Sequence, residues 1–223
     1  MDLGFIFDLD GVLTDTVEPH YRSWERLARE EGVPFSREDN AALLGRTRED
    51  ALDLWLNGRP ASPGERAELL RRKNEYFLEG LADLGPGDLL PGVAELLRET
   101  RERGIPLGLA SSSRNARLVC DRLGVTDLFG AFADGSSVVH PKPAPDVFLW
   151  VAGRLGLHPA RCVVFEDAEA GVRAALAGGF AVVGLGDPAR VGGAQRVRPD
   201  LGGATVDEFR PLTARENAPA PMP

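Results

Sequence analysis

The stretch Leu3-Gly4-Phe5-Ile6-Phe7-Asp8-Leu9-Asp10-Gly11 decides the fold. An apolar run of this kind is typical of a buried strand, and the glycine indicates a turn directly after it. Asp8 and Asp10 lie two residues apart at the strand end, where a continuing strand would direct both carboxylates to one face. Carboxylates held this close repel each other, and a hard cation such as Mg²⁺ would relieve the repulsion. A solvated turn whose acids cap the next helix is the alternative that these residues alone leave open.

The chain after this strand divides into a helical stretch and an alternating stretch. Apolar residues recur at helical spacing over 18–84, and strands alternate with helices beyond Gly85-Pro86-Gly87. The alternation predicts an α/β fold, a doubly wound parallel sheet, and the helical stretch predicts an inserted all-helical cap domain. We expect a core domain over 1–14 and 86–213, a cap domain over 15–85, and a loose C-terminal tail over 214–223. The later strands are expected at 105–110, 131–133, 162–165 and 181–184, and the helices between them at 93–102, 116–123, 145–155 and 168–177.

Composition excludes several classes of protein. The 223 residues include 26 Lys and Arg against 34 Asp and Glu, a formal net charge of −8, which argues against nucleic acid or an anionic membrane as the main partner. No apolar stretch approaches the ~18 residues that span a bilayer, and the N-terminus lacks the charge pattern of a signal peptide. Cys120 and Cys162 fall in apolar patterns, as buried thiols in a reducing compartment do. We therefore expect a cytoplasmic protein.

Three further polar clusters lie where strands are expected to end or helices to begin. They are Ser111-Ser112-Ser113, the pair Glu166-Asp167, and Lys142 between two prolines. Ligands of open parallel sheets bind at the carboxyl ends of strands, so these clusters are expected to meet Asp8 and Asp10. Hydroxyls beside a helix N-terminus favour an anion pocket, although a plain helix cap is the alternative for the serines.

Several candidate residues have an ordinary structural alternative. Lys142 could be an exposed loop lysine, and His20, early in the first expected helix, could be a surface or packing residue. Arg48 could hold a phosphate or could simply start a helix in solvent. Only Lys73 and Lys142 are lysines among the 26 basic residues. Because a lysine carries a compact ammonium and an arginine a wide planar fork, these two positions are candidates for sites that require an ammonium.

Taken together, the clusters resemble the four motifs of the haloacid dehalogenase superfamily of phosphotransferases, in the subgroup with a helical cap. Phe7-Asp8-Leu9-Asp10-Gly11-Val12-Leu13-Thr14-Asp15-Thr16 resembles the nucleophile loop of that superfamily. Ser111, Lys142 and Glu166-Asp167 stand in the order of its second, third and fourth motifs. A finer resemblance, to the β-phosphoglucomutase family, rests on His20 and on the segments 47–50, 72–74, 109–115, 142–146 and 166–171.

The resemblance implies a role for each candidate residue. Asp8 would form an aspartyl-phosphate and Asp10 would act as general acid and base, while Thr16 and His20 would couple cap closure to Asp10. The metal would be Mg²⁺, held by Asp8, the backbone carbonyl of Asp10 and Asp167, with Glu166 nearby. The residues that would bind substrate or its phosphates are Ser111 and Lys142 at the transferring phosphoryl group, Arg48, Ser113 and Asn115 at the far phosphate, Lys73 at the sugar, and Gly45 and Ser112 beside them.

The implied activity is a mutase that interconverts β-glucose 1-phosphate and glucose 6-phosphate through β-glucose 1,6-bisphosphate. A sugar-phosphate phosphatase and a non-catalytic phosphosugar sensor are the alternatives. The resemblance also implies a small-molecule sugar phosphate as the partner, and we expect a monomer. Two departures affect this interpretation: Leu44 stands where the family commonly has a lysine, and Ala168 where it often has a serine. The first leaves the identity of the sugar open.

Overall fold

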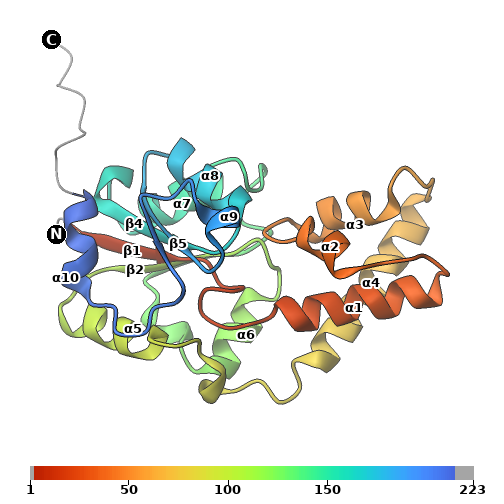
Figure 1. The fold of residues 1–223 in the computed structure, drawn as a ribbon, viewed down its shortest axis with the longest axis horizontal. Helices are drawn as coiled ribbons and strands as arrows, with labels where there is room; N and C mark the ends of the chain where they lie inside the picture. Colours follow the sequence, from red (N-terminus) through yellow and green to blue (C-terminus); the bar gives the residue numbers. More distant parts are fainter. Residues whose placement is uncertain (1–2, 214–223) are drawn as a thin grey trace, which may run out of the picture.

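A single parallel sheet organises the computed structural model, which describes residues 3–213. Its strands lie in the order β3-β2-β1-β4-β5-β6, and every neighbouring pair is parallel (Figure 1). The first strand therefore lies inside the sheet, between β2 and β4, and the chain order reverses beside it. The strands are β1 (Gly4–Phe7), β2 (Leu107–Ala110), β3 (Ala131–Ala133), β4 (Cys162–Glu166), β5 (Ala181–Leu185) and β6 (Arg196–Arg198).

Helices cover both faces of the sheet, as the alternating pattern predicts. Successive side chains of a strand point to opposite faces, so Phe5 and Phe7 join one buried cluster and Ile6 joins the other. The first cluster includes α5 (Val93–Glu102), α6 (Ala116–Leu123) and α10 (Val206–Phe209), and the second includes α7 (Asp146–Arg154), α8 (Glu169–Ala177) and α9 (Pro188–Val191). Short 3₁₀ segments lie at Pro86–Asp88, Thr126–Leu128, Pro159–Arg161 and Arg210–Thr213.

The first four of the helices between β1 and β2 form a group beside the sheet (Figure 1). Their apolar faces meet in a cluster of their own, in which Trp24 stacks on Trp55 with ring centroids 5.9 Å apart. A separate core of this kind is what the helical stretch predicts, and the boundary of a cap domain at residues 15–85 stays a prediction. The helices are α1 (Val17–Glu30), α2 (Arg37–Ala41), α3 (Arg48–Leu56) and α4 (Pro63–Gly80).

The observed elements differ from the expected ones in four places. The helices α2, α9 and α10 and the strand β6 have no counterpart among the predicted elements. All four are short, and β6 is half-buried with an arginine at each end, so it lacks an apolar pattern. None of the described helices is long and apolar enough to cross a membrane. The tail expected at 214–223 lies outside the described residues.

Candidate active site

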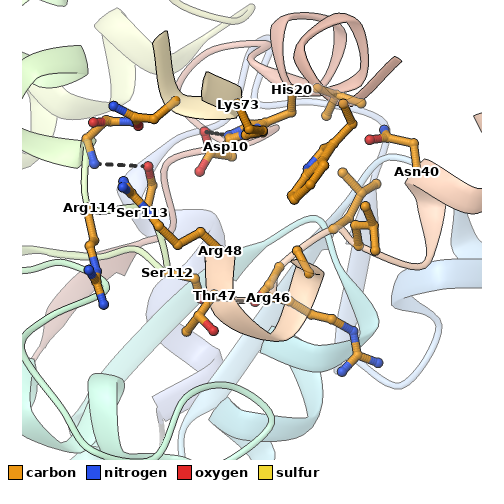
Figure 2. Close-up of a pocket in the computed structure, with 18 of the residues that line it drawn as sticks. Asp10, His20, Asn40, Arg46, Thr47, Arg48, Lys73, Ser112, Ser113 and Arg114 are labelled. Atoms are coloured by element: carbon orange, nitrogen blue, oxygen red, sulfur yellow. Dashed lines mark hydrogen bonds and ion pairs between the residues drawn. The ribbon is translucent and has the colours of Figure 1, made fainter. Parts of the chain in front are cut away.

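The site lies where three neighbouring strands end. Asp8 follows β1, Ser111 follows β2, and Glu166 and Asp167 lie at the end of β4. The parallel pairing brings these ends to one edge of the sheet, because Phe7 is in register with both Leu109 and Phe165. A cavity opens from this edge toward the four helices of the insertion (Figure 2). The structure thus brings together polar clusters that are as far as 159 residues apart in the chain.

Lys142 is the charged centre of this edge. It is only 2% exposed, and its Nζ donates to Asp8 Oδ1 at 2.6 Å, to Glu166 Oε1 at 2.8 Å and to the Ala110 carbonyl at 3.1 Å. Burial lowers the pKa of Lys142, but the two carboxylates outweigh burial and hold the pKa above its ordinary value. The Lys142-Pro143 peptide bond is cis. An exposed loop lysine is therefore the wrong interpretation of this residue.

Three buried carboxyl groups form a cluster, and two of them, Asp8 and Glu166, contact the lysine. Oxygen atoms of Asp8, Glu166 and Asp167 all lie within 4.8 Å of one another. Burial raises the pKa of Asp8 to about 7 despite the opposing charge of Lys142. Burial, followed by the charges of Glu166 and Asp8, also raises the pKa of Asp167 well above its ordinary value. Two cations face these three acids, Lys142 and Arg190, whose Nη2 lies 3.8 Å from Asp167 Oδ2, so the ionised cluster keeps a surplus of negative charge that a divalent cation would neutralise.

The donor set fits Mg²⁺, which prefers carboxylate and carbonyl oxygens. Gly11 leaves room for the Asp167 carboxylate: its φ is +79°, and a Cβ there would lie 2.3 Å from Asp167 Oδ2. The carboxylate of Asp10 lies apart from this set, because it accepts a hydrogen bond from Thr16 Oγ1. Asp10 could therefore contribute its backbone carbonyl, as the family resemblance implies, but its side chain is engaged elsewhere.

The raised pKa of Asp8 predicts how stability depends on pH without metal. Because the folded-state pKa of about 7 lies above the ordinary value of 3.8, the folded protein keeps a proton that the unfolded chain releases between these values. The free energy of unfolding in EDTA is therefore expected to fall as pH rises from about 4 to about 7. Urea titrations across this range should show a shallower fall for Asp8→Asn. An unchanged slope in that variant would contradict the assignment, and Asp83→Asn, at an exposed carboxylate, serves as the control.

A second chain of contacts leads from the insertion to Asp10. Lys73 Nζ lies 2.7 Å from His20 Nδ1, and His20 Nε2 lies 3.8 Å from Asp10 Oδ1. When Lys73 carries its proton it only donates, so in that state Nδ1 of His20 accepts and the imidazole proton sits on Nε2, facing Asp10. Burial lowers the pKa of Lys73 to about 7, holds that of His20 well below its usual range, and raises that of Asp10. His20 is thus a neutral imidazole between two titratable groups and stacks on Phe77 at 4.0 Å.

The opposite end of the cavity is basic. Arg48, at the first turn of α3, has no hydrogen bond or ion pair anywhere in residues 3–213, and it lies beside Ser113 (Figure 2). Burial and the charge of Arg114 lower the pKa of Arg48. The backbone N–H of Asn115 donates to Ser113 Oγ at 3.2 Å. This end therefore offers an unpaired guanidinium next to a hydroxyl and an amide, a set suited to an anion.

Arg114 is a candidate that the sequence analysis missed. It lines the same cavity, and its Nη2 lies 2.8 Å from Glu49 Oε1 on α3. Its position directly after Ser113 in the chain was the available signal. The pairing of a loop residue with a residue of the insertion becomes visible only in the fold.

Gly45 and Ser112 hold the insertion against the sheet. Ser112 Oγ donates to the Gly45 carbonyl at 2.9 Å, and Gly45 has a φ of +72°. Leu44 lines the cavity beside them, whereas Arg46 Nε donates to the Ala42 carbonyl at 3.0 Å, and its guanidinium extends away from the Asp10 end (Figure 2). Arg46 therefore does not bring its charge to the place of the missing family lysine.

Comparison with known proteins places this geometry in a family. The model of the haloacid dehalogenase-like hydrolases matches residues 4–179. The chain belongs to this family. It is 39% identical over 222 residues to β-phosphoglucomutase of Bacillus subtilis (strain 168), and this match covers 96% of this chain and 98% of the relative. It is 33% identical over 180 residues to the fructose-1-phosphate phosphatase YqaB of Escherichia coli, covering 81% of this chain and 94% of the relative.

A solved structure of a family member has the same fold over nearly its whole length. The crystal structure of β-phosphoglucomutase from Clostridium difficile superposes with a TM-score of 0.91 at 32% identity, covering 96% of this chain and 97% of that one. The chain is therefore an enzyme of the haloacid dehalogenase family. Since the family members similar to it include both a mutase and a phosphatase, the partition between these reactions is a separate question.

Proposed function

We propose that this enzyme interconverts β-glucose 1-phosphate and glucose 6-phosphate through β-glucose 1,6-bisphosphate. The observation that supports the proposal most strongly is a cavity with two ends that each suit a phosphate. Asp8, which accepts a hydrogen bond from Lys142, lines one end together with Asp10, and the unpaired Arg48 lies beside Ser113 at the other. A hexose that carries a phosphate at each end of the molecule matches such a cavity. The similarity to two β-phosphoglucomutases agrees with it.

Asp8 is the proposed nucleophile. Its carboxylate oxygen forms a bond to phosphorus as the bond between phosphorus and the sugar oxygen breaks, which leaves an aspartyl-phosphate and a free sugar hydroxyl. Lys142 donates to Asp8 at 2.6 Å, so its charge opposes the effect of burial on the pKa of Asp8 and favours the ionised carboxylate. Lys142 would also meet the transferring phosphoryl oxygens together with Ser111. A bound Mg²⁺, held by Asp8, Asp167 and the backbone carbonyl of Asp10 with Glu166 nearby, would neutralise phosphoryl charge.

Asp10 is the proposed general acid and base. Its pKa is raised by burial, which suits a group that gives a proton to the departing sugar oxygen and takes one from the attacking hydroxyl. Its carboxylate is tied to Thr16 and faces His20, which in turn contacts Lys73 of the insertion. Movement of the insertion relative to the sheet would therefore move the partners of Asp10. Thr16 and His20 are positioning residues in this proposal.

The far phosphate is proposed to bind at the basic end of the cavity. Arg48 and Arg114 offer two guanidinium groups, and an arginine can grip a phosphate through two parallel hydrogen bonds. Ser113 and Asn115 add a hydroxyl and an amide, and the Asn115 amide already donates to Asn74 Oδ1 of α4 at 2.9 Å. Lys73 lines the cavity beside His20 and is proposed to face the sugar.

A mutase has to keep water from the aspartyl-phosphate while the bisphosphate turns round. Three contacts hold the insertion over the site in this structure: Ser112 to Gly45, Asn115 to Asn74, and Arg114 to Glu49. All three join the loop after β2 to the insertion, beside the proposed far-phosphate site. The bound phosphate and the closed form of the enzyme would therefore stabilise each other.

A sugar-phosphate phosphatase is the second candidate, and Leu44 favours it. Leu44 lines the cavity where the resemblance leads one to expect a lysine, and Arg46 does not replace that charge. A phosphatase needs only water at the position of the second sugar oxygen. On this alternative the same Asp8 intermediate forms, but it is hydrolysed, and the released product is inorganic phosphate.

Lys142→Arg is expected to lower kcat at least tenfold, which corresponds to about 1.4 kcal/mol. The ammonium of Lys142 fits between Asp8, Glu166 and the Ala110 carbonyl in a buried space, and the wider planar guanidinium cannot make the same three contacts. Steady-state turnover tests this, with circular dichroism to confirm folding. Near-normal kcat in Lys142→Arg would show that the ammonium is not required.

The proposed function is tested by supplying β-glucose 1-phosphate, Mg²⁺ and a trace of β-glucose 1,6-bisphosphate, and by following glucose 6-phosphate. We expect rapid formation of glucose 6-phosphate that depends on the bisphosphate as activator. The α-anomer serves as the matched control and should react far more slowly. If no glucose 6-phosphate forms from the β-anomer, the proposed mutase function is wrong.

A further inference from the structure

The helix α2 has one buried residue, and that residue is polar. Asn40 is 5% exposed, while its helical neighbours Glu38, Asp39 and Ala41 are exposed. A helix that contributes a single side chain to the interior ordinarily contributes an apolar one. The helix is fixed at its start by a reciprocal capping box between Ser36 and Asp39, so the position of Asn40 is defined by the local structure.

The side-chain amide of Asn40 has no hydrogen-bond partner among residues 3–213. It nevertheless lines the cavity of the candidate active site, and Figure 2 shows the amide directed into the space on the His20 side, across from Arg48. Among the described residues, Trp55 Nε1 is the one fully buried side-chain nitrogen or oxygen without a partner, so the Asn40 amide is not sealed off from the cavity. A ligand bound in the cavity could therefore exchange hydrogen bonds with the amide.

The surroundings of Asn40 indicate what kind of group it meets. Trp24, Leu43 and Leu44 contribute apolar side chains to the lining of the same cavity, and Arg48, a candidate for phosphate binding, lies across from Asn40. An amide both donates and accepts, and so does a hydroxyl, whereas a phosphate would be drawn to the unpaired Arg48 instead. The matching ligand group is therefore an uncharged hydroxyl.

We propose that Asn40 determines specificity by binding one hydroxyl of the sugar ring. This inference rests on the proposed function, because it requires a sugar phosphate between the two ends of the cavity. Lys73, on the neighbouring face of the cavity, lies with its Nζ 5.3 Å from the centre of the Trp24 ring. The apolar wall, the amide and the ammonium together would distinguish sugars that carry a hydroxyl at this position from those that lack it.

The test compares the wild type with Asn40→Leu on β-glucose 1-phosphate and on its 2-, 3- and 4-deoxy forms. With the parent sugar, Asn40→Leu is expected to lower kcat/KM about 10- to 100-fold, because the hydroxyl loses its partner in an apolar site. With one deoxy form, the two enzymes should agree within about twofold. The melting temperature should not fall, since the amide has no partner within the described residues to lose. A volume-conserving change at the adjacent wall, Leu43→Met, is the control and should affect all four sugars equally.

Three outcomes would overturn the inference. The first is an unchanged kcat/KM of Asn40→Leu on the parent sugar, and the second is an equal loss on the parent and on every deoxy form. The third is a fall in melting temperature large enough to account for the lost activity, which would give Asn40 a structural role. Wild-type turnover of the parent sugar separates these failures from a failure of the proposed function, since an inactive wild type would contradict both.

Discussion

Asp10→Asn is expected to reduce kcat for glucose 6-phosphate formation by about 10²- to 10⁴-fold. Asparagine has the shape of aspartate and can still accept the hydrogen bond from Thr16, but it cannot give a proton to the departing sugar oxygen or take one from the attacking hydroxyl. The structure keeps this carboxyl apart from the three acids around Lys142. Proton transfer and metal binding are therefore assigned to different side chains.

Stopped-flow and steady-state measurements of glucose 6-phosphate formation by Asp10→Asn test whether Asp10 is the group that transfers the proton. Asp15→Asn is the matched control, because Asp15 lies in the same loop, is exposed, and accepts only the backbone N–H of Val17. The control should retain most of the wild-type kcat. If Asp10→Asn turned over at a near-normal rate, Asp10 would not be the general acid and base.

Arg48→Ala is expected to lower kcat/KM for β-glucose 1-phosphate. The expected decrease corresponds to a loss of about 2–5 kcal/mol of transition-state stabilisation. The reason is that Arg48 has no partner in the described part of the chain, so its full hydrogen-bonding capacity is available to a phosphate. Arg46→Ala, two residues earlier, is the control, because that side chain contacts the Ala42 carbonyl. The control should leave kcat/KM within a small factor of the wild type.

A substrate with one phosphate and no sugar separates the two ends of the cavity. Hydrolysis of acetyl phosphate needs Asp8 and its neighbours but no far-phosphate site, so Arg48→Ala should leave it nearly unchanged. A comparable loss on acetyl phosphate and on β-glucose 1-phosphate would mean that Arg48 acts at the Asp8 end or supports the fold, contrary to the assignment.

Local sequence patterns predicted the main parts of the fold and the meeting of its motifs. The apolar run before Asp8 predicted a buried strand, and the alternation after residue 87 predicted a parallel sheet, as observed. Because the ends of parallel strands meet at one edge, strand positions alone predicted that Asp8, Ser111 and Glu166 would lie together. The two lysines singled out by composition are both buried, Lys73 at 6% and Lys142 at 2% exposed.

Other features depend on contacts between distant segments and have no local pattern. The pairing of Arg114 with Glu49 joins residues 65 positions apart, and nothing in either segment specifies it. Asn40 belongs to a helix of five residues, too short to show an apolar period. The edge strand β6 carries arginines that pair with Glu208, an arrangement that hydrophobicity does not predict. Residues of this kind are recognised only once the fold places them.

The fate of the aspartyl-phosphate is the central question about this enzyme. The measurement that tests it most directly supplies β-glucose 1-phosphate, Mg²⁺ and a trace of the 1,6-bisphosphate, and follows glucose 6-phosphate and inorganic phosphate in the same reaction. On the proposed function, in which the cavity binds a phosphate at each end and the insertion closes over it, glucose 6-phosphate forms in large excess over inorganic phosphate. Rapid release of inorganic phosphate with little glucose 6-phosphate would contradict the mutase and identify a phosphatase.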